Sequence, residues 1–137
     1  MTGLTRKCKY ALRALYFLAR EYGKGPILIQ IISAQANAPA EFLQTILLTL
    51  KNAGVVGSRR GIQGGYYLVI PPEQVTIGSI VRILDGPLFP LPCIGKRETR
   101  ACADCHDADA CQTRFLMREV HDAVTAILEH TTIVPTC

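Results

Sequence analysis

The 137-residue sequence lacks any apolar run long enough to cross a membrane. Its longest apolar run, residues 27–32, is interrupted by Gln30, whereas a spanning helix needs about 20 predominantly apolar residues. The first 20 residues do not resemble a signal peptide either, because Arg13 breaks the apolar stretch and no small-residue cleavage site follows it. Internal repeats and low-complexity segments are also missing. We therefore expect a cytoplasmic protein of one domain, with or without an appendage, and no membrane partner.

The sequence also lacks an arrangement of residues typical of an enzyme. The glycines between residues 57 and 65 precede a predicted strand rather than a helix, so they do not form a nucleotide-binding loop. His121 and His130 fall in a predicted helix, with no cysteine or serine partner at a meaningful spacing. Since no paired acid and base and no activated nucleophile can be recognised, we expect that this protein is not an enzyme.

Acidic residues are scarce in the first part of the chain. Residues 1–60 contain nine Lys or Arg and two Asp or Glu, a balance of +7, whereas residues 61–137 contain six and nine, a balance of −3. Apolar residues make up 49% of the chain and charged residues 19%, which is typical of a globular protein with a packed core. The basic half is therefore the candidate for binding a polyanion.

Hydrophobic periodicity predicts a mainly α fold with a small β-hairpin. Thr5 is a candidate N-cap of the first helix, and Gly23 and Gly54 are candidate stop signals. The second and third helices, joined by a tight turn, form a helix-turn-helix candidate, and the following hairpin makes the order typical of a winged helix. The predicted elements are helices at 4–22, 27–37 and 39–52, strands at 55–56 and 66–70 around a turn at 57–65, and a helix at 76–84.

The C-terminal part is predicted to be a loop followed by one long helix. Residues 87–110 contain three prolines and no hydrophobic period, whereas residues 111–130 have a helical period. The apolar face of this helix suggests a partner helix, most simply from a second copy of the chain, although folding back onto its own domain remains an alternative. The expected organisation is a winged helix-turn-helix DNA-binding domain (1–86), a cysteine-rich loop (87–110), a dimerisation helix (111–133) and a tail (134–137).

Several residues of the basic half are candidates for contacting DNA. The second helix of a helix-turn-helix lies in the major groove, where Glu41 can accept from cytosine, Gln44 can pair with adenine, and Thr45 can contact a phosphate or a thymine methyl group. Arginines at a wing tip suit a narrow minor groove, and basic residues at a helix start suit phosphates. Each residue alone also fits an ordinary solvated surface. The predicted set is Arg6, Lys7, Lys9, Glu41, Phe42, Gln44, Thr45, Arg59 and Arg60.

Four of the six cysteines fall between residues 93 and 111. In a cytosolic protein such a cluster favours metal or redox chemistry over structural disulfides. Zinc sites usually have two tight cysteine pairs, and only one C-x-x-C is present here, whereas iron–sulfur clusters accept wider spacing. An iron–sulfur cluster, a zinc site and a thiol redox switch all remain open. The candidate ligands are Cys93, Cys102, Cys105 and Cys111, with His106 as a further candidate, while Cys8 fits a small core residue and Cys137 an incidental one.

Three segments and the cysteine-bearing loop resemble the IscR/NsrR-type iron–sulfur winged-helix transcriptional regulators. The segments are residues 50–56 (LKNAGVV), residues 60–68 with Arg-Gly followed by Gly-Gly-Tyr-Tyr-Leu, and residues 75–78 (VTIG), and the similarity covers residues 4–133. The resemblance implies a homodimer crossed through its C-terminal helix and bound to a pseudo-palindromic DNA operator. It also implies an iron–sulfur cluster, of the 2Fe–2S or 4Fe–4S type, that senses redox state, nitric oxide or iron supply and changes operator affinity, most simply in a repressor.

The resemblance also assigns roles to individual residues. Cys93, Cys105 and Cys111 match the three loop cysteines that hold the cluster. Arg60 matches the wing arginine that enters the minor groove, and residues 41–45 occupy the base-contacting positions.

Two departures leave parts of this assignment open. The gap between Cys93 and Cys105 is long and contains the extra Cys102, and Arg114 stands where some relatives have a histidine ligand. Cys102 is the first candidate for a fourth ligand. Cys8 is the second, because some relatives recruit a residue near the start of the first helix from the partner subunit, and His106 is the third. The alternative functions are a zinc-holding or metal-free thiol-redox regulator and a protein-interaction module that binds no DNA.

Overall fold

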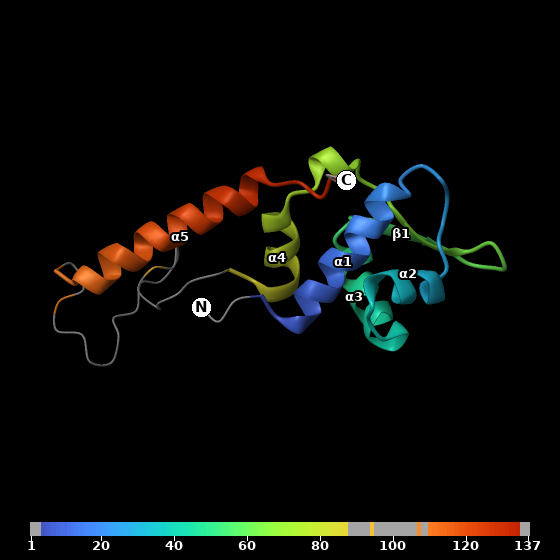
Figure 1. The fold of residues 1–137 in the computed structure, drawn as a ribbon, viewed down its shortest axis with the longest axis horizontal. Helices are drawn as coiled ribbons and strands as arrows, with labels where there is room; N and C mark the ends of the chain where they lie inside the picture. The colour runs from blue at the N-terminus through green and yellow to red at the C-terminus, as the bar shows by residue number, and fades with distance from the viewer. Residues whose placement is uncertain (1–3, 88–93, 95–106, 108–109, 135–137) are drawn as a thin grey trace.

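A computed structural model describes residues 4–87, Ile94, Asp107 and residues 110–134 (Figure 1). The helices α1 to α4 and the hairpin gather at one end of the molecule, and α5 extends away from them. The predicted mainly α fold with a small hairpin is confirmed. The elements are α1 (Arg6–Arg20), α2 (Ile29–Ala36), α3 (Ala40–Asn52), β1 (Val56–Arg59), β2 (Gly65–Leu68), the 3-10 helix η1 (Pro72–Gln74), α4 (Ile77–Asp85) and α5 (Gln112–His130).

Local sequence signals set the helix boundaries. Thr5 is the N-cap of α1 as predicted, since its side-chain oxygen accepts a hydrogen bond from the N–H of Cys8 at 3.1 Å. At the end of α3, Gly54 adopts a φ of 84°, which glycine reaches without strain. The N–H groups of Gly54 and Val55 then donate to the carbonyls of Lys51 and Leu50, both at 3.0 Å, and so terminate the helix.

The four helices α1, α2, α3 and α4 share one hydrophobic core with the hairpin. The core side chains recur at helical spacing, so each helix contributes one apolar stripe. Ile133, beyond the end of α5, is also completely buried in this core. The largest fully buried side chains are Leu15, Leu18, Ile32, Leu43, Ile46, Leu47, Leu50, Ile80 and Ile133.

The hairpin differs from the prediction at both strand ends. The antiparallel register pairs Val56 with Leu68 and Arg59 with Gly65, so β1 extends into the segment that was expected to be a turn, and β2 ends two residues earlier than expected. The physical reason lies at Gly57, where a Cβ atom would stand 2.5 Å from the ring of Tyr67. The glycine makes room for the opposing aromatic ring and so continues the strand instead of ending it. The 3-10 helix η1 was not predicted.

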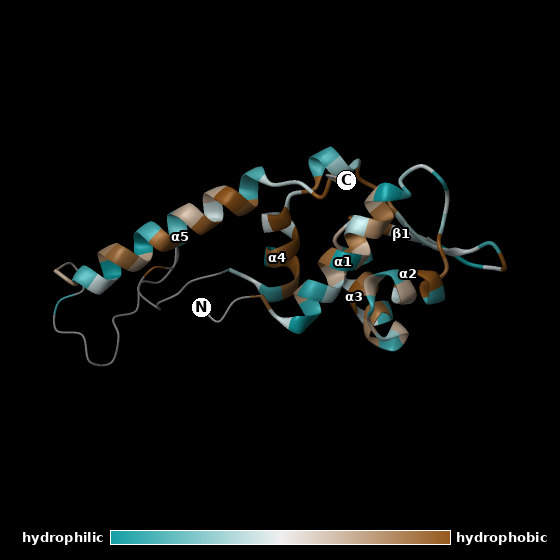
Figure 2. Cartoon of the chain, in the orientation of Figure 1, coloured by the Kyte–Doolittle hydropathy of each residue, from teal (hydrophilic) through white to brown (hydrophobic). Residues whose placement is uncertain are grey.

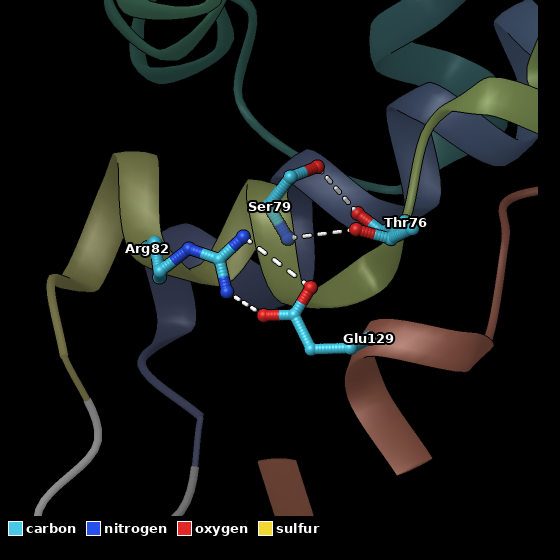
Figure 3. A network of polar contacts seen from close by, with 4 residues as sticks. All are labelled: Thr76, Ser79, Arg82 and Glu129. Carbon is cyan, nitrogen blue, oxygen red and sulfur yellow. Dashed lines mark hydrogen bonds and ion pairs between the residues drawn. The ribbon is translucent and has the colours of Figure 1, made fainter. Parts of the chain in front are cut away.

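The C-terminal end of α5 is fixed to α4 and to the segment before it. Ile77 N–H donates to the carbonyl of Thr131 at 2.8 Å, and Ile133 N–H donates to the carbonyl of Val75 at 3.0 Å. Figure 3 shows the guanidinium of Arg82 on α4 facing both carboxylate oxygens of Glu129 on α5. The rest of α5 extends from this attachment, and none of its residues is fully buried.

Parts of the predicted organisation cannot be compared with the structure. The cysteine-bearing loop at 87–110 and the tail at 134–137 lie mostly outside the described residues. Among the described helices, none is long and apolar enough to cross a membrane.

Candidate nucleic-acid interface and cysteine site

One face of α3 is exposed and carries the residues predicted to contact bases. Glu41, Gln44 and Thr45 are exposed. The buried residues of α3 are Leu43, Ile46, Leu47 and Leu50. Leu48 continues this face one turn further and has 55% of its surface exposed. Leu48 was not among the residues predicted to contact DNA, although its spacing of three from Thr45 and four from Gln44 could have identified it.

Phe42 has a different environment from its neighbours on α3. Its ring meets the ring of Tyr10 on α1 edge to face, with 5.6 Å between the ring centroids, and it remains 40% exposed. The guanidinium of Arg13 lies 5.9 Å from the Tyr10 ring, within the range of a cation–π contact. Phe42 therefore packs α3 against α1, and Arg13 adds a positive charge beside this contact that sequence reasoning missed.

The wing lies next to the end of α3. Lys51 on α3 donates a hydrogen bond from its Nζ to the Oγ of Ser58 on β1 at 2.7 Å. Arg59 ends β1, Arg60 follows it, and both are exposed. The structure therefore fixes β1, the strand that leads into the two predicted wing arginines, against the C-terminal end of the predicted recognition helix.

The start of α1 provides the third basic group. Arg6, Lys7 and Lys9 are all exposed there. Thr5 Oγ1 donates a hydrogen bond to Asp85 Oδ1 at 2.6 Å, which connects the start of α1 to the last residue of α4. These three positive charges are consequently held at a fixed place relative to the point where the cysteine-bearing loop leaves α4.

Cys8 lies inside the core despite its basic neighbours. Its side chain has no exposed surface, and burial together with the nearby Asp85 carboxylate raises the pKa of its thiol to about 11. Cysteines buried in apolar surroundings, with a raised pKa, are typically structural rather than reactive. The placement favours the interpretation of Cys8 as a small core residue over the alternative that it is a cluster ligand.

Cys111 is the described member of the predicted ligand set. It is the N-cap residue of α5, it is half-buried, and its side chain makes no capping hydrogen bond. Arg114 lies one turn further along and offers no lone pair to a metal. The other proposed ligands lie outside the described residues; they are Cys93, Cys102, Cys105 and His106. Among the residues that the structure describes, no group of three or more His, Cys, Asp or Glu side chains could hold a metal ion.

Comparison with known proteins identifies the class of protein. The Rrf2 family model, described as an iron-dependent transcriptional regulator, matches residues 4–135. The chain belongs to the Rrf2 family. It is similar to an rrf2-like HTH-type transcriptional regulator from Rhodobacter capsulatus, with 41% identity over 133 residues that cover 95% of this chain and 89% of the relative.

Solved structures of relatives share the fold of this Rrf2 protein. CymR, described as the global cysteine regulator of B. subtilis, is 32% identical with a TM-score of 0.79, and the match covers 97% of this chain and 94% of CymR. The IscR of T. potens is 26% identical with a TM-score of 0.74, covering 96% and 82% of the two chains. The resemblance to IscR-type regulators, the winged helix-turn-helix fold and the assignment to transcriptional regulators rather than enzymes are confirmed.

Proposed function

We propose that this Rrf2 protein is a cytoplasmic, dimeric repressor whose cysteine-bound iron–sulfur cluster changes its affinity for a DNA operator. The observation that carries the proposal is the Lys51–Ser58 hydrogen bond at 2.7 Å, which fixes β1, the strand that leads into the exposed wing arginines, to the C-terminal end of α3. A recognition helix and a wing held in this way can enter adjacent grooves of one duplex.

The charges on this surface support DNA as the partner. The exposed basic residues at the start of α1 and on the wing suit phosphates and a narrow minor groove. On α3 the side chains that face solvent are mainly polar groups with the donors and acceptors needed for base edges. In the proposed complex, Gln44 and Thr45 contact bases while Arg6, Lys7 and Lys9 hold the phosphate backbone.

The exposed stripe on α5 supports a homodimer. Leu116, Val120 and Ile127 lie on one side of the helix, and Leu116 and Ile127 are 55% and 66% exposed. Figure 2 shows apolar segments recurring along the part of α5 that extends away from the other helices. Glu129 contacts α4 from a different side of the helix, so α4 does not cover this stripe. The same stripe from a second copy would remove it from water and place two recognition helices on one operator.

The chemistry of the cysteines fits an iron–sulfur cluster. Cys111 lies at the N-terminal end of α5, where the helix dipole favours a negatively charged thiolate–metal group. In the proposal Cys93, Cys105 and Cys111 hold the cluster, with Cys102 as the first candidate for the fourth ligand. The cluster would supply a centre that responds to oxidants, nitric oxide or iron supply. The loop that holds it would connect α4 directly to the start of α5.

The first test is the composition of the anaerobically purified protein. We expect visible absorption between roughly 320 and 460 nm together with iron and acid-labile sulfide, as thiolate-bound clusters require. Cys111→Ala should lose both elements, whereas Cys137→Ala should keep them. Zinc in place of iron would instead favour the zinc-holding regulator, and metal-free protein that responds to oxidants would favour a thiol switch.

The second test concerns DNA. Operator sequences are selected from a random duplex library with the cluster-loaded protein, and affinity is measured at several salt concentrations. A phosphate-binding protein loses affinity steeply as salt rises. Arg60→Ala should weaken binding, whereas Arg118→Ala, which removes the same charge from α5, should not. If no selected duplex binds, the protein-interaction module becomes the better explanation.

A further inference from the structure

Ile62 is the most exposed of the large apolar side chains in the described part of the chain. It has 97% of its surface exposed, whereas the next most exposed, Ile127, has 66%. Single exposed apolar residues are common on protein surfaces and by themselves indicate nothing. The position of Ile62, at the tip of the wing and two residues after Arg60, distinguishes it from such residues.

The backbone at the wing tip holds Ile62 at the apex. The N–H of Gly64 donates to the carbonyl of Gly61 at 3.0 Å and closes a four-residue turn around Ile62 and Gln63. Gly61 has a φ of 106°, and a Cβ on Gly64 would stand 2.2 Å from the carbonyl oxygen of Arg59. Glycines permit this tight turn, and the only apolar side chain in it points into solvent.

The start of β2, next to the wing tip, is held by a third segment of backbone. Ile27 and Tyr66 exchange two backbone hydrogen bonds, at 2.8 and 2.9 Å. Gly65 makes this approach feasible, because a Cβ there would stand 2.1 Å from the Ile27 carbonyl oxygen. A wing that is already ordered in the free protein loses less conformational entropy when it binds its ligand.

We infer that Ile62 is an apolar wedge that enters the DNA minor groove and partly unstacks one base step. The inference rests on the proposed DNA-binding function and adds a role for a residue that makes no polar contact. Arg59 and Arg60 precede the turn and would draw the tip towards the negative potential of a narrow minor groove. Proteins that bind this groove insert side chains such as Ile, Leu or Phe between bases and kink the duplex.

A wedge of this kind would add specificity without hydrogen bonds. Pyrimidine–purine steps, such as TA, unstack and kink more easily than other steps. The operator half-site should therefore carry such a step where the wing tip lands.

The test compares four proteins on one selected operator: wild type, Ile62→Ala, Arg60→Ala and Val69→Ala. Val69 is the matched control, because it is an exposed apolar residue, 49% exposed, just after β2 and away from the tip. Affinity is measured at several salt concentrations, and the DNA bend is measured by energy transfer between dyes at the duplex ends.

We expect Ile62→Ala to bind about tenfold more weakly, since three buried carbon atoms are lost from the contact, and to bend the operator less. Its salt dependence should match wild type, because no phosphate contact is removed, whereas Arg60→Ala should reduce the salt slope by about one per wing. Val69→Ala should behave as wild type. Since Ile62 makes little contact with the fold, its thermal unfolding should not change.

If wild type and Ile62→Ala bend the operator equally, Ile62 is not a wedge, even if the two proteins differ in operator affinity. If Arg60→Ala still weakened binding in that case, the proposed DNA-binding function would stand without the wedge. Failure of wild type to bind any selected duplex would instead remove the proposed function together with the inference.

Discussion

Gly65 is the residue whose replacement should affect the wing most. It has a φ of 143°, and its missing side chain leaves room for the Ile27 carbonyl. Gly65→Ala should separate Ile27 from β2 and lower the free energy of unfolding by roughly 1–3 kcal/mol, measured by urea denaturation. Gln63→Ala, in the exposed turn, should change it by less than about 0.5 kcal/mol. Equal stability of Gly65→Ala and wild type would show that the backbone can rearrange there without cost.

Cys8 should make stability depend on alkaline pH. Burial and the Asp85 carboxylate raise the pKa of its thiol from 9.0 to about 11, so the folded protein keeps a proton that the unfolded chain releases. The contribution of the protonated Cys8 thiol to the stability of the fold is therefore complete below pH 9, and it is lost as the pH rises towards 11. Between these limits the free energy of unfolding should fall by up to about 1.4 kcal/mol per pH unit on this account.

The measurement is urea denaturation of cluster-free, reduced protein at pH 8, 9 and 10, beside the variant Cys8→Ala. The variant will be less stable throughout, because it leaves a small cavity in the core. The informative quantity is the difference between the two proteins, which should shrink as the pH rises. A constant difference would mean that Cys8 does not titrate differently in the folded and unfolded states.

Residues governed by their immediate neighbours in sequence could be predicted, and those governed by distant contacts could not. Thr5 and Gly54 were identified correctly because helix caps depend on a few adjacent backbone groups. The packing of Phe42 on Tyr10 joins residues 32 positions apart, and nothing in the pattern of α3 indicates it. Ile62 was missed because an apolar residue in a polar turn has no periodic signal.

At the level of elements, α5 is the helix whose exposed side most needs an explanation. Leu116, Val120 and Ile127 share one side of it, and no α5 residue is fully buried. Its existence was predicted from periodicity, but its packing against α4 required contacts through Glu129 that a one-dimensional pattern does not contain. The hairpin was mispredicted for a similar reason. In the sequence alone Gly57 is typical of a turn, and only its contact with Tyr67 on the opposite strand shows that it belongs to β1.

Introducing charge on the exposed stripe of α5 should therefore separate the proposed dimer. Ile127→Glu places a carboxylate among apolar side chains at the interface, where an unpaired charge is costly. Sedimentation velocity should show a monomer at micromolar concentration, with operator affinity at least about tenfold lower because one recognition helix is lost. Arg118→Glu introduces the same carboxylate on the opposite side of the helix and should leave the dimer intact. A dimeric Ile127→Glu protein would move the interface away from α5.

At the scale of the whole molecule, the contacts that the described residues show between α5 and α4 lie at the C-terminal end of α5. Its C-terminal end is fixed by the Arg82–Glu129 ion pair and by the backbone bonds of Ile77 and Ile133, whereas its N-terminal end begins at Cys111. A change at the cysteine site would therefore act at the end of α5 that is opposite to its attachment to α4. Asp85, at the other end of α4, is hydrogen-bonded to Thr5 at the start of α1. This chain of contacts provides a route from the cysteines to the residues proposed to bind phosphates.

The Arg82–Glu129 pair should accordingly matter more for regulation than for stability. Both side chains are partly exposed, at 54% and 33%, so the pair contributes about 0–1 kcal/mol to folding. Glu129→Gln keeps the packing against Gly78 but removes the charge that holds α5 on α4. We expect the melting temperature to change little and the affinity of the cluster-free protein to stay within about twofold of wild type.

The ratio of operator affinities with and without the cluster is the quantity that should change. If tilting of α5 passes to α4 through this pair, Glu129→Gln should bring that ratio closer to one by up to about fivefold, which corresponds to a coupling of about 1 kcal/mol. Glu119→Gln, an exposed carboxylate elsewhere on α5, serves as the control and should keep the wild-type ratio. An unchanged ratio in Glu129→Gln would show that the signal reaches the DNA-binding surface by another contact, of which the backbone bonds around Ile133 are the next to test.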